Sequence, residues 1–81
     1  MATNQQKGTA TDHRERVAKA RELGAAAFHR GTRCAPAADN AALVPLYYSQ
    51  PHATKVAIFR AWSAAWIAES LAAPLPEEQE T

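Results

Sequence analysis

The stretch that decides the fold is KVAIFRAWSAAWIA, residues 55–68. On a helical wheel its large apolar side chains share an arc of about 180°, wider than the usual stripe: Val56, Ile58, Phe59, Trp62, Trp66 and Ile67. A helix with so wide an apolar face must contact more than one neighbour. The opposite side of this helix consists of Ala57, Ala61, Ala64 and Ala68. These alanines form either a smooth ridge against which another helix packs closely or an exposed face of helix-forming residues.

Both ends of this helix have local signals. Ser49 is an N-cap residue type and Pro51 is tolerated in a first turn, whereas Pro74 cannot continue a helix. We therefore predict a helix over about residues 51–72.

An earlier amphipathic pattern predicts another helix over about residues 12–31. Asp12 is an N-cap type with Glu15 three residues later, and Gly31 is a C-terminal stop. The apolar stripe is narrow and consists mostly of small residues: Val17, Ala20, Gly24, Ala27, Phe28 and Gly31. Glycine costs about 1 kcal/mol relative to alanine inside a helix, so Gly24 indicates that something approaches the backbone closely there.

A long connector, residues 32–50, joins the two helices. Asp39 is suited to cap a short helical turn that Pro45 ends, and the run from Leu43 to Tyr48 is expected to cover the wide face, with Tyr47 and Tyr48 in the core. Residues 1–10 are polar and residues 74–81 are acidic and contain proline, so both tails are expected to be disordered. The prediction is an all-α protein with one helical domain over residues 11–73.

The composition predicts a small core and a cytoplasmic location. The apolar fraction is 47%, but 20 of these residues are alanines, so the 81-residue chain has few large side chains to bury. A homodimer or a host complex would complete such a core. One cysteine excludes an intramolecular disulfide, and no export leader or membrane-spanning run is visible, so we expect a cytoplasmic protein without a membrane segment.

No residue pattern predicts an enzyme, a metal site or a cofactor. Cys34, His29 and Asp39 are residue types of a catalytic triad, but Cys34 follows a helix C-terminus, whose negative dipole disfavours a thiolate. A half-buried structural thiol is the expected role. The other candidate metal ligands, His13 and His52, add no paired spacing, and the three glycines stand alone, so no phosphate-binding loop is predicted.

The charges are unevenly distributed along the chain. Through Cys34 there are seven Lys and Arg against three Asp and Glu, whereas after it there are two against five. A basic first helix indicates a polyanionic or acidic partner. Its candidate partner-binding residues are Arg14, Arg16, Lys19, Arg21, Arg30 and Arg33. The alternative is an ordinary solvated helix face, in which Glu15 pairs with Lys19 four residues later.

Two signatures resemble the ribosome modulation factor family and its small phage and mobile-element relatives. One is GAAAFHRG at residues 24–31 followed by CAP at residues 34–36, and the other is a pair of tryptophans four residues apart, Trp62 and Trp66. The resemblance implies a compact two-helix body and docking on ribosomal RNA through a basic surface. With the helical patterns, it places these residues in the structural core: Gly24, Phe28, Gly31, Phe59, Trp62 and Trp66. The chain differs from the family in a shorter spacing from Gly31 to Cys34, a longer connector and a nearly neutral charge.

Three functions remain open at this point. The first is a non-enzymatic accessory protein of phage or mobile-element type that binds the ribosome or RNA and modulates it. The second is a protein-binding inhibitor of host machinery, such as an anti-CRISPR or another anti-defence protein, and the third is a structural homodimer.

Overall fold

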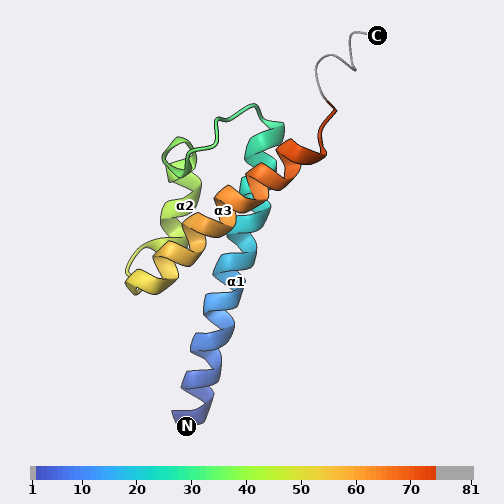
Figure 1. The fold of residues 1–81 in the computed structure, drawn as a ribbon. Coiled ribbons are helices and arrows are strands. Elements are labelled where there is room, and N and C mark those ends of the chain that lie inside the picture. The colour runs from blue at the N-terminus through green and yellow to red at the C-terminus, as the bar shows by residue number, and fades with distance from the viewer. Residues whose placement is uncertain (1, 75–81) are drawn as a thin grey trace.

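The chain forms three α-helices and one short 3-10 helix (Figure 1). In this computed structural model, the backbone is described for residues 2–74 and the side chains for residues 11–74. The elements are α1 (Ala2–His29), η1 (Pro36–Asp39), α2 (Asn40–Tyr47) and α3 (His52–Ala72). No strand occurs between residues 2 and 74, so the predicted all-α class is confirmed.

Helices α1 and α3 run in the same direction and cross each other, with α2 to one side (Figure 1). His13 is hydrogen bonded to Thr54 near the start of α3, and His29 is paired with Glu69 near its end. The N-terminal part of α1 extends beyond the other helices, and the molecule measures 62 × 20 × 16 Å. Its packed part therefore lies between residue 12 and the end of α3.

The predicted start of α1 at Asp12 is wrong, because the helix already begins at Ala2. The backbone is helical from residue 2, and the expectation that residues 1–10 form a disordered tail stays a prediction. No proline precedes Asp12, so nothing in this segment forbids helical backbone angles. Asp12 accepts a hydrogen bond from Arg16 Nε at 2.7 Å, one turn further along the helix. The acidic tail, beyond Pro74, lies outside the described residues.

Gly31 ends α1 as predicted. Its φ angle is 83°, a conformation that glycine adopts without strain. The N–H of Thr32 donates to the Ala27 carbonyl and the N–H of Gly31 to that of Phe28, both at 3.0 Å, which is a Schellman motif. Gly31 is exposed, and a Cβ there would meet nothing within 4 Å, so its predicted place in the core is wrong. Its role is conformational.

The crossing of α1 and α3 lies at Gly24 and Trp62. A Cβ on Gly24 would overlap the Trp62 carbonyl oxygen and would lie 2.8 Å from its carbonyl carbon. The close approach predicted at Gly24 is therefore confirmed, and the other backbone is that of α3.

The core at this crossing is small. Its buried apolar residues are Ala20, Ala27, Leu43, Ile58, Ala61 and Trp62, of which only Trp62, Leu43 and Ile58 are large and fully buried. Phe59 and Trp66 pack against this cluster, and Phe28 meets Trp66 edge to face at 5.2 Å. Of the predicted core residues other than Gly31, Gly24 and Trp62 are buried, and the three remaining aromatics are half-buried.

The connector differs from its prediction in detail. Pro45 lies inside α2 instead of ending it, and Asp39 precedes α2 without a side-chain capping bond. Ser49 is not the N-cap of α3 but a turn residue with φ of 62°, and α3 begins at His52 after Pro51. The bounds of α3 otherwise agree with the predicted 51–72.

Two adjacent tyrosines at the end of α2 have opposite environments. Tyr47 packs against Phe59 with ring centroids 5.1 Å apart, and its hydroxyl donates to Asn40 Oδ1 at 2.7 Å. Tyr48 is 71% exposed, so its predicted place in the core is wrong.

The alanine side of α3 is divided between the two predicted roles. Ala61 is buried in the core, whereas Ala64 and Ala68 are exposed. The ridge is thus used for close packing at one position and presents small residues to solvent further along.

Candidate functional site

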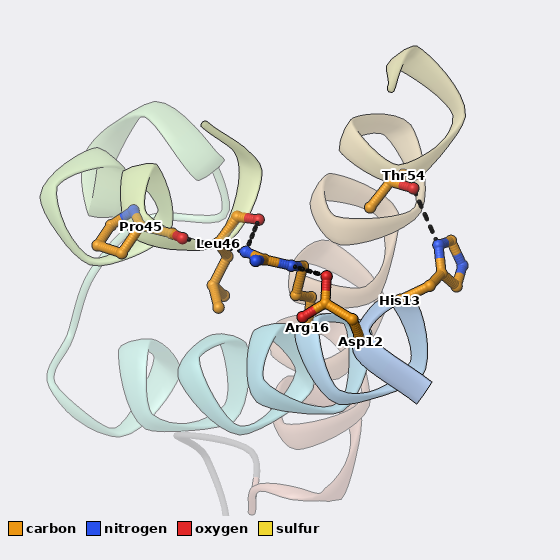
Figure 2. A network of polar contacts seen from close by, with 6 residues as sticks. All are labelled: Asp12, His13, Arg16, Pro45, Leu46 and Thr54. Carbon is orange, nitrogen blue, oxygen red and sulfur yellow. Dashed lines mark hydrogen bonds and ion pairs between the residues drawn. The ribbon is translucent and has the colours of Figure 1, made fainter. Parts of the chain in front are cut away.

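The first of the six predicted partner-binding residues, Arg16, is used inside the molecule. Its Nη1 donates to the carbonyl oxygens of Pro45 at 3.2 Å and Leu46 at 2.8 Å, near the end of α2. Figure 2 shows the guanidinium between these carbonyls and Asp12. A cation at the carbonyl end of a helix satisfies unpaired acceptors and opposes the helix dipole. Arg16 therefore has a structural role at the end of α2, and its predicted partner-binding role stays a prediction.

Arg30 is also engaged, at a junction of three segments. Its Nη2 donates to Asp39 Oδ1 at 3.0 Å, and Trp62 Nε1 donates to Oδ2 of the same carboxylate at 2.9 Å. Asp39 is only 8% exposed, so both of its oxygens find partners inside the fold. In addition, Trp66 Nε1 donates to the Thr32 carbonyl at 2.7 Å. The two tryptophans thus attach the connector to α3, and the Arg30 side chain remains 51% exposed beside it.

Lys19 pairs with Glu22 at 3.7 Å and not with Glu15 as predicted. Both side chains are exposed, and such a pair contributes little to stability. It does reduce the local positive charge on this side of α1.

The remaining three predicted residues are available at the surface. Arg14, Arg21 and Arg33 are exposed, and no ion pair is recorded for them within residues 11–74. Arg14 and Arg21 are seven residues apart, so they lie on the same side of α1 about 10.5 Å apart along its axis. Arg16 projects from a different side, toward α2, so the Arg14 and Arg21 side faces away from α2. We call these two residues the α1 arginine pair.

Sequence reasoning missed two further cations, Lys55 and Arg60 of α3. Neither has a recorded ion pair in the described part of the chain. They do not belong to a basic run, and no other local signal in the sequence marks them.

Ion pairs within the described part of the chain leave fewer acidic than basic residues without a partner. Of the acidic residues between positions 11 and 74, four have a partner within the fold: Asp12, Glu22, Asp39 and Glu69. Only Glu15 has none among these residues. Among the same residues, five cations have no ion pair: Arg14, Arg21, Arg33, Lys55 and Arg60. Within residues 11–74, the charged side chains without an ion pair are therefore mainly cations.

The candidate catalytic and metal-binding residues lie in separate places. His29 Nε2 is 2.7 Å from Glu69 Oε1, and His13 Nδ1 is 3.0 Å from Thr54 Oγ1. Cys34 is exposed, so its expected half-buried position is wrong. In the part of the chain that the structure describes, no three His, Cys, Asp or Glu residues gather as a metal site would require.

Two shallow grooves are lined by residues that the structure describes. One of about 510 Å³ lies beside α1 and Leu46, and its charged side chains carry both signs. The other, of about 360 Å³, lies where α1 and α3 end and contains the pair of His29 and Glu69. Both are open, unlike the enclosed sites that bury most of a small ligand.

Comparison of the chain with protein-family models, with curated proteins and with solved structures finds no match. Among the described residues, no helix combines the length and the hydropathy that a membrane span requires.

Proposed function

We propose that the protein is a non-enzymatic accessory protein that binds RNA on a macromolecular assembly, the ribosome being the first candidate, and modulates that assembly. The ribosome is suggested by the resemblance of residues 24–36 and of Trp62 and Trp66 to the ribosome modulation factor family. Within this proposal the protein is of phage or mobile-element type and acts in the cytoplasm.

One observation carries the proposal: within residues 11–74, ion pairs or hydrogen bonds engage four of the five acidic residues, whereas five cations have no ion pair. Each phosphate that such a cation contacts releases counterions, which gives affinity without sequence preference. The α1 arginine pair faces away from α2, so a nucleic acid is able to approach both residues at once.

Co-sedimentation with purified ribosomes at two salt concentrations tests the proposal. We expect the wild-type protein to bind at low salt and to dissociate at high salt. The logarithm of the binding constant should fall by about 0.7–0.9 per logarithmic unit of salt for each phosphate contact. Arg14→Ala combined with Arg21→Ala should weaken binding and flatten this salt dependence by the contribution of about two contacts.

A matched control comes from α3. Arg60→Ala removes one exposed arginine without a recorded ion pair, as Arg21→Ala does, but from another helix. If the α1 arginine pair forms the contact, Arg21→Ala should weaken binding several-fold more than Arg60→Ala. Equal effects of the two substitutions would mean that binding depends only on the net charge of the protein. The proposal would be refuted if the wild-type protein did not associate with ribosomes, or if its association did not depend on salt.

A second candidate, the protein-binding inhibitor of host machinery such as an anti-CRISPR protein, is favoured by the outer side of α3. Leu71 is 82% and Ile67 47% exposed there, beside the exposed alanines Ala64 and Ala68. A pull-down from nuclease-treated host lysate separates the two candidates, because only a protein partner should survive the digestion. The same surface would serve a homodimer, which light scattering at micromolar concentration would detect.

A further inference from the structure

The groove where α1 and α3 end contains Pro74, the last residue that the structure describes. Apart from the pair of His29 with Glu69, the lining of this groove is apolar: Phe28, Ala72, Ala73 and Pro74. The N–H of Ala73 donates to the carbonyls of Glu69 at 3.1 Å and Ser70 at 3.3 Å, which holds the chain to the end of α3. The next segment, residues 75–81, therefore starts from this groove.

The composition of residues 75–81 complements what surrounds their starting point. The segment begins with Leu75, whose apolar side chain matches the apolar lining of the groove. The chain has eight acidic residues, and the three that do not lie between positions 11 and 74 are Glu77, Glu78 and Glu80. The segment contains no Lys or Arg. It is therefore an acidic segment attached to a molecule whose unpaired charges, within residues 11–74, are mainly cations.

Two arginines follow α1 directly and lie at this end of the molecule, where α1 and α3 end beside each other (Figure 1). Trp66 Nε1 donates to the Thr32 carbonyl, so the chain that leaves α1 is held against the last two turns of α3. Arg33, the next residue, is exposed and has no ion pair among residues 11–74. Arg30 binds Asp39 through Nη2, and its side chain is 51% exposed.

The acidic segment is long enough to reach these arginines. Trp66, which holds Thr32, precedes Ala72 at the end of α3 by six residues, or about 9 Å of helix axis. An extended chain spans at most about 3.3–3.6 Å per residue, so Glu77 lies up to about 10 Å and Glu80 up to about 20 Å beyond Pro74. The glutamates therefore have Arg33 within their range.

Two opposing effects decide whether such a contact forms. Both helices end here, and a helix C-terminus carries a negative partial charge of about half an elementary charge, which disfavours an acidic segment. The Schellman motif already pairs the Ala27 and Phe28 carbonyls of α1, and two arginines carry full charges. Exposed ion pairs are individually weak. A short tether, however, keeps the segment at an effective concentration of about millimolar, so weak contacts suffice.

We propose that residues 75–81 dock on the ends of α1 and α3, with Leu75 in the groove and the glutamates against Arg33 and Arg30. The docked segment competes with a polyanion for these two cations and thus limits its binding. The docking is independent of the proposed function, whereas the competition rests on it, because it regulates the same cationic surface.

The single cysteine of the chain provides the test of docking, because Cys34 is exposed and adjacent to Arg33. A nitroxide attached to Cys34 should broaden the amide NMR signals of Glu77, Glu78 and Glu80 at low salt, and high salt should reverse much of this broadening. Arg33→Ala should lower the docking equilibrium constant by up to about fivefold, the contribution of one exposed ion pair.

Arg60→Ala is the matched control for Arg33→Ala. It removes another exposed arginine without an ion pair among residues 11–74, but one about 18 Å along the α3 axis from Ala72. This variant should show the broadening of the wild type. Equal broadening in the wild type, in Arg33→Ala and at high salt would overturn the docking, since attachment to Pro74 would then explain the proximity alone.

The competition is tested by neutralising the segment with Glu77→Gln, Glu78→Gln and Glu80→Gln together. This variant should bind ribosomes several-fold more tightly than the wild type at low salt, and the gain should be smaller in an Arg33→Ala background. An equal affinity of variant and wild type, or an undiminished gain in that background, would overturn the competition. If neither protein bound ribosomes, the proposed function would fail, while the nitroxide measurement would still decide whether the segment docks.

Discussion

Gly24 sets the distance at which α1 and α3 cross. Two effects oppose each other at this position: alanine is a better helix former by about 1 kcal/mol, but its Cβ would overlap the Trp62 carbonyl. A backbone carbonyl cannot move aside as the end of a flexible side chain can. We expect Gly24→Ala to lower the free energy of unfolding by about 1–3 kcal/mol, the usual cost of overpacking. Urea denaturation followed by tryptophan fluorescence measures this.

An exposed position of the same helix provides the control. Ala26→Gly makes the reverse exchange at an exposed residue, so it should cost only the difference in helix propensity, about 1 kcal/mol. A Gly24→Ala variant as stable as the wild type, or more stable, would mean that the helices separate at little cost.

Helix α2 depends on contacts with α1 for its stability. It has eight residues, too few for a stable isolated helix, and Pro45 has no N–H to donate within it. The hydrogen bonds from Arg16 to its last carbonyls come from a charged donor, and such bonds contribute about 1.5–3 kcal/mol. Arg16→Ala should therefore speed amide hydrogen exchange of Tyr48, whose N–H closes α2, by about tenfold or more.

Arg14→Ala is the matched control, because it removes an exposed arginine from the same segment of α1. Exchange at Tyr48 should stay at the wild-type rate in this variant. Equal exchange rates in Arg16→Ala and the wild type would show that packing alone holds α2.

The elements that could be predicted are those with a local cause. Gly31 and Pro74 end their helices through the backbone of their own segment, so the sequence predicted both stops. Arg14 and Arg16 are alike in the sequence, and only contacts with Pro45 and Leu46, 29 and 30 residues away, distinguish them. Asp12 was misread as a cap because its carboxylate instead accepts from Arg16 within a helix that continues. The candidate site was therefore predictable as a set of cations, but not as the subset that remains free.

In the molecule as a whole, the Asp39 side chain connects all three helices, which the small apolar core holds together only weakly. Its carboxylate connects Arg30 after α1, the start of α2 and Trp62 of α3. Only three large side chains are fully buried, so we expect a small free energy of unfolding for this chain of 81 residues. The hydrogen bonds and the ion pair of the buried Asp39 carboxylate should therefore supply a large share of that free energy.

Two substitutions of Asp39 distinguish its hydrogen bond with Trp62 from its ion pair with Arg30. Asp39→Ala leaves the buried Trp62 N–H without an acceptor and should lower the free energy of unfolding by about 1–3 kcal/mol. Asp39→Asn keeps an oxygen for Trp62 and loses only the ion pair with the half-exposed Arg30, so it should cost about 1 kcal/mol or less. Chemical denaturation followed by fluorescence and by circular dichroism should give one transition for each variant, with an unchanged slope. If Asp39→Asn were as destabilising as Asp39→Ala, the charge and not the bond to Trp62 would hold the three helices together.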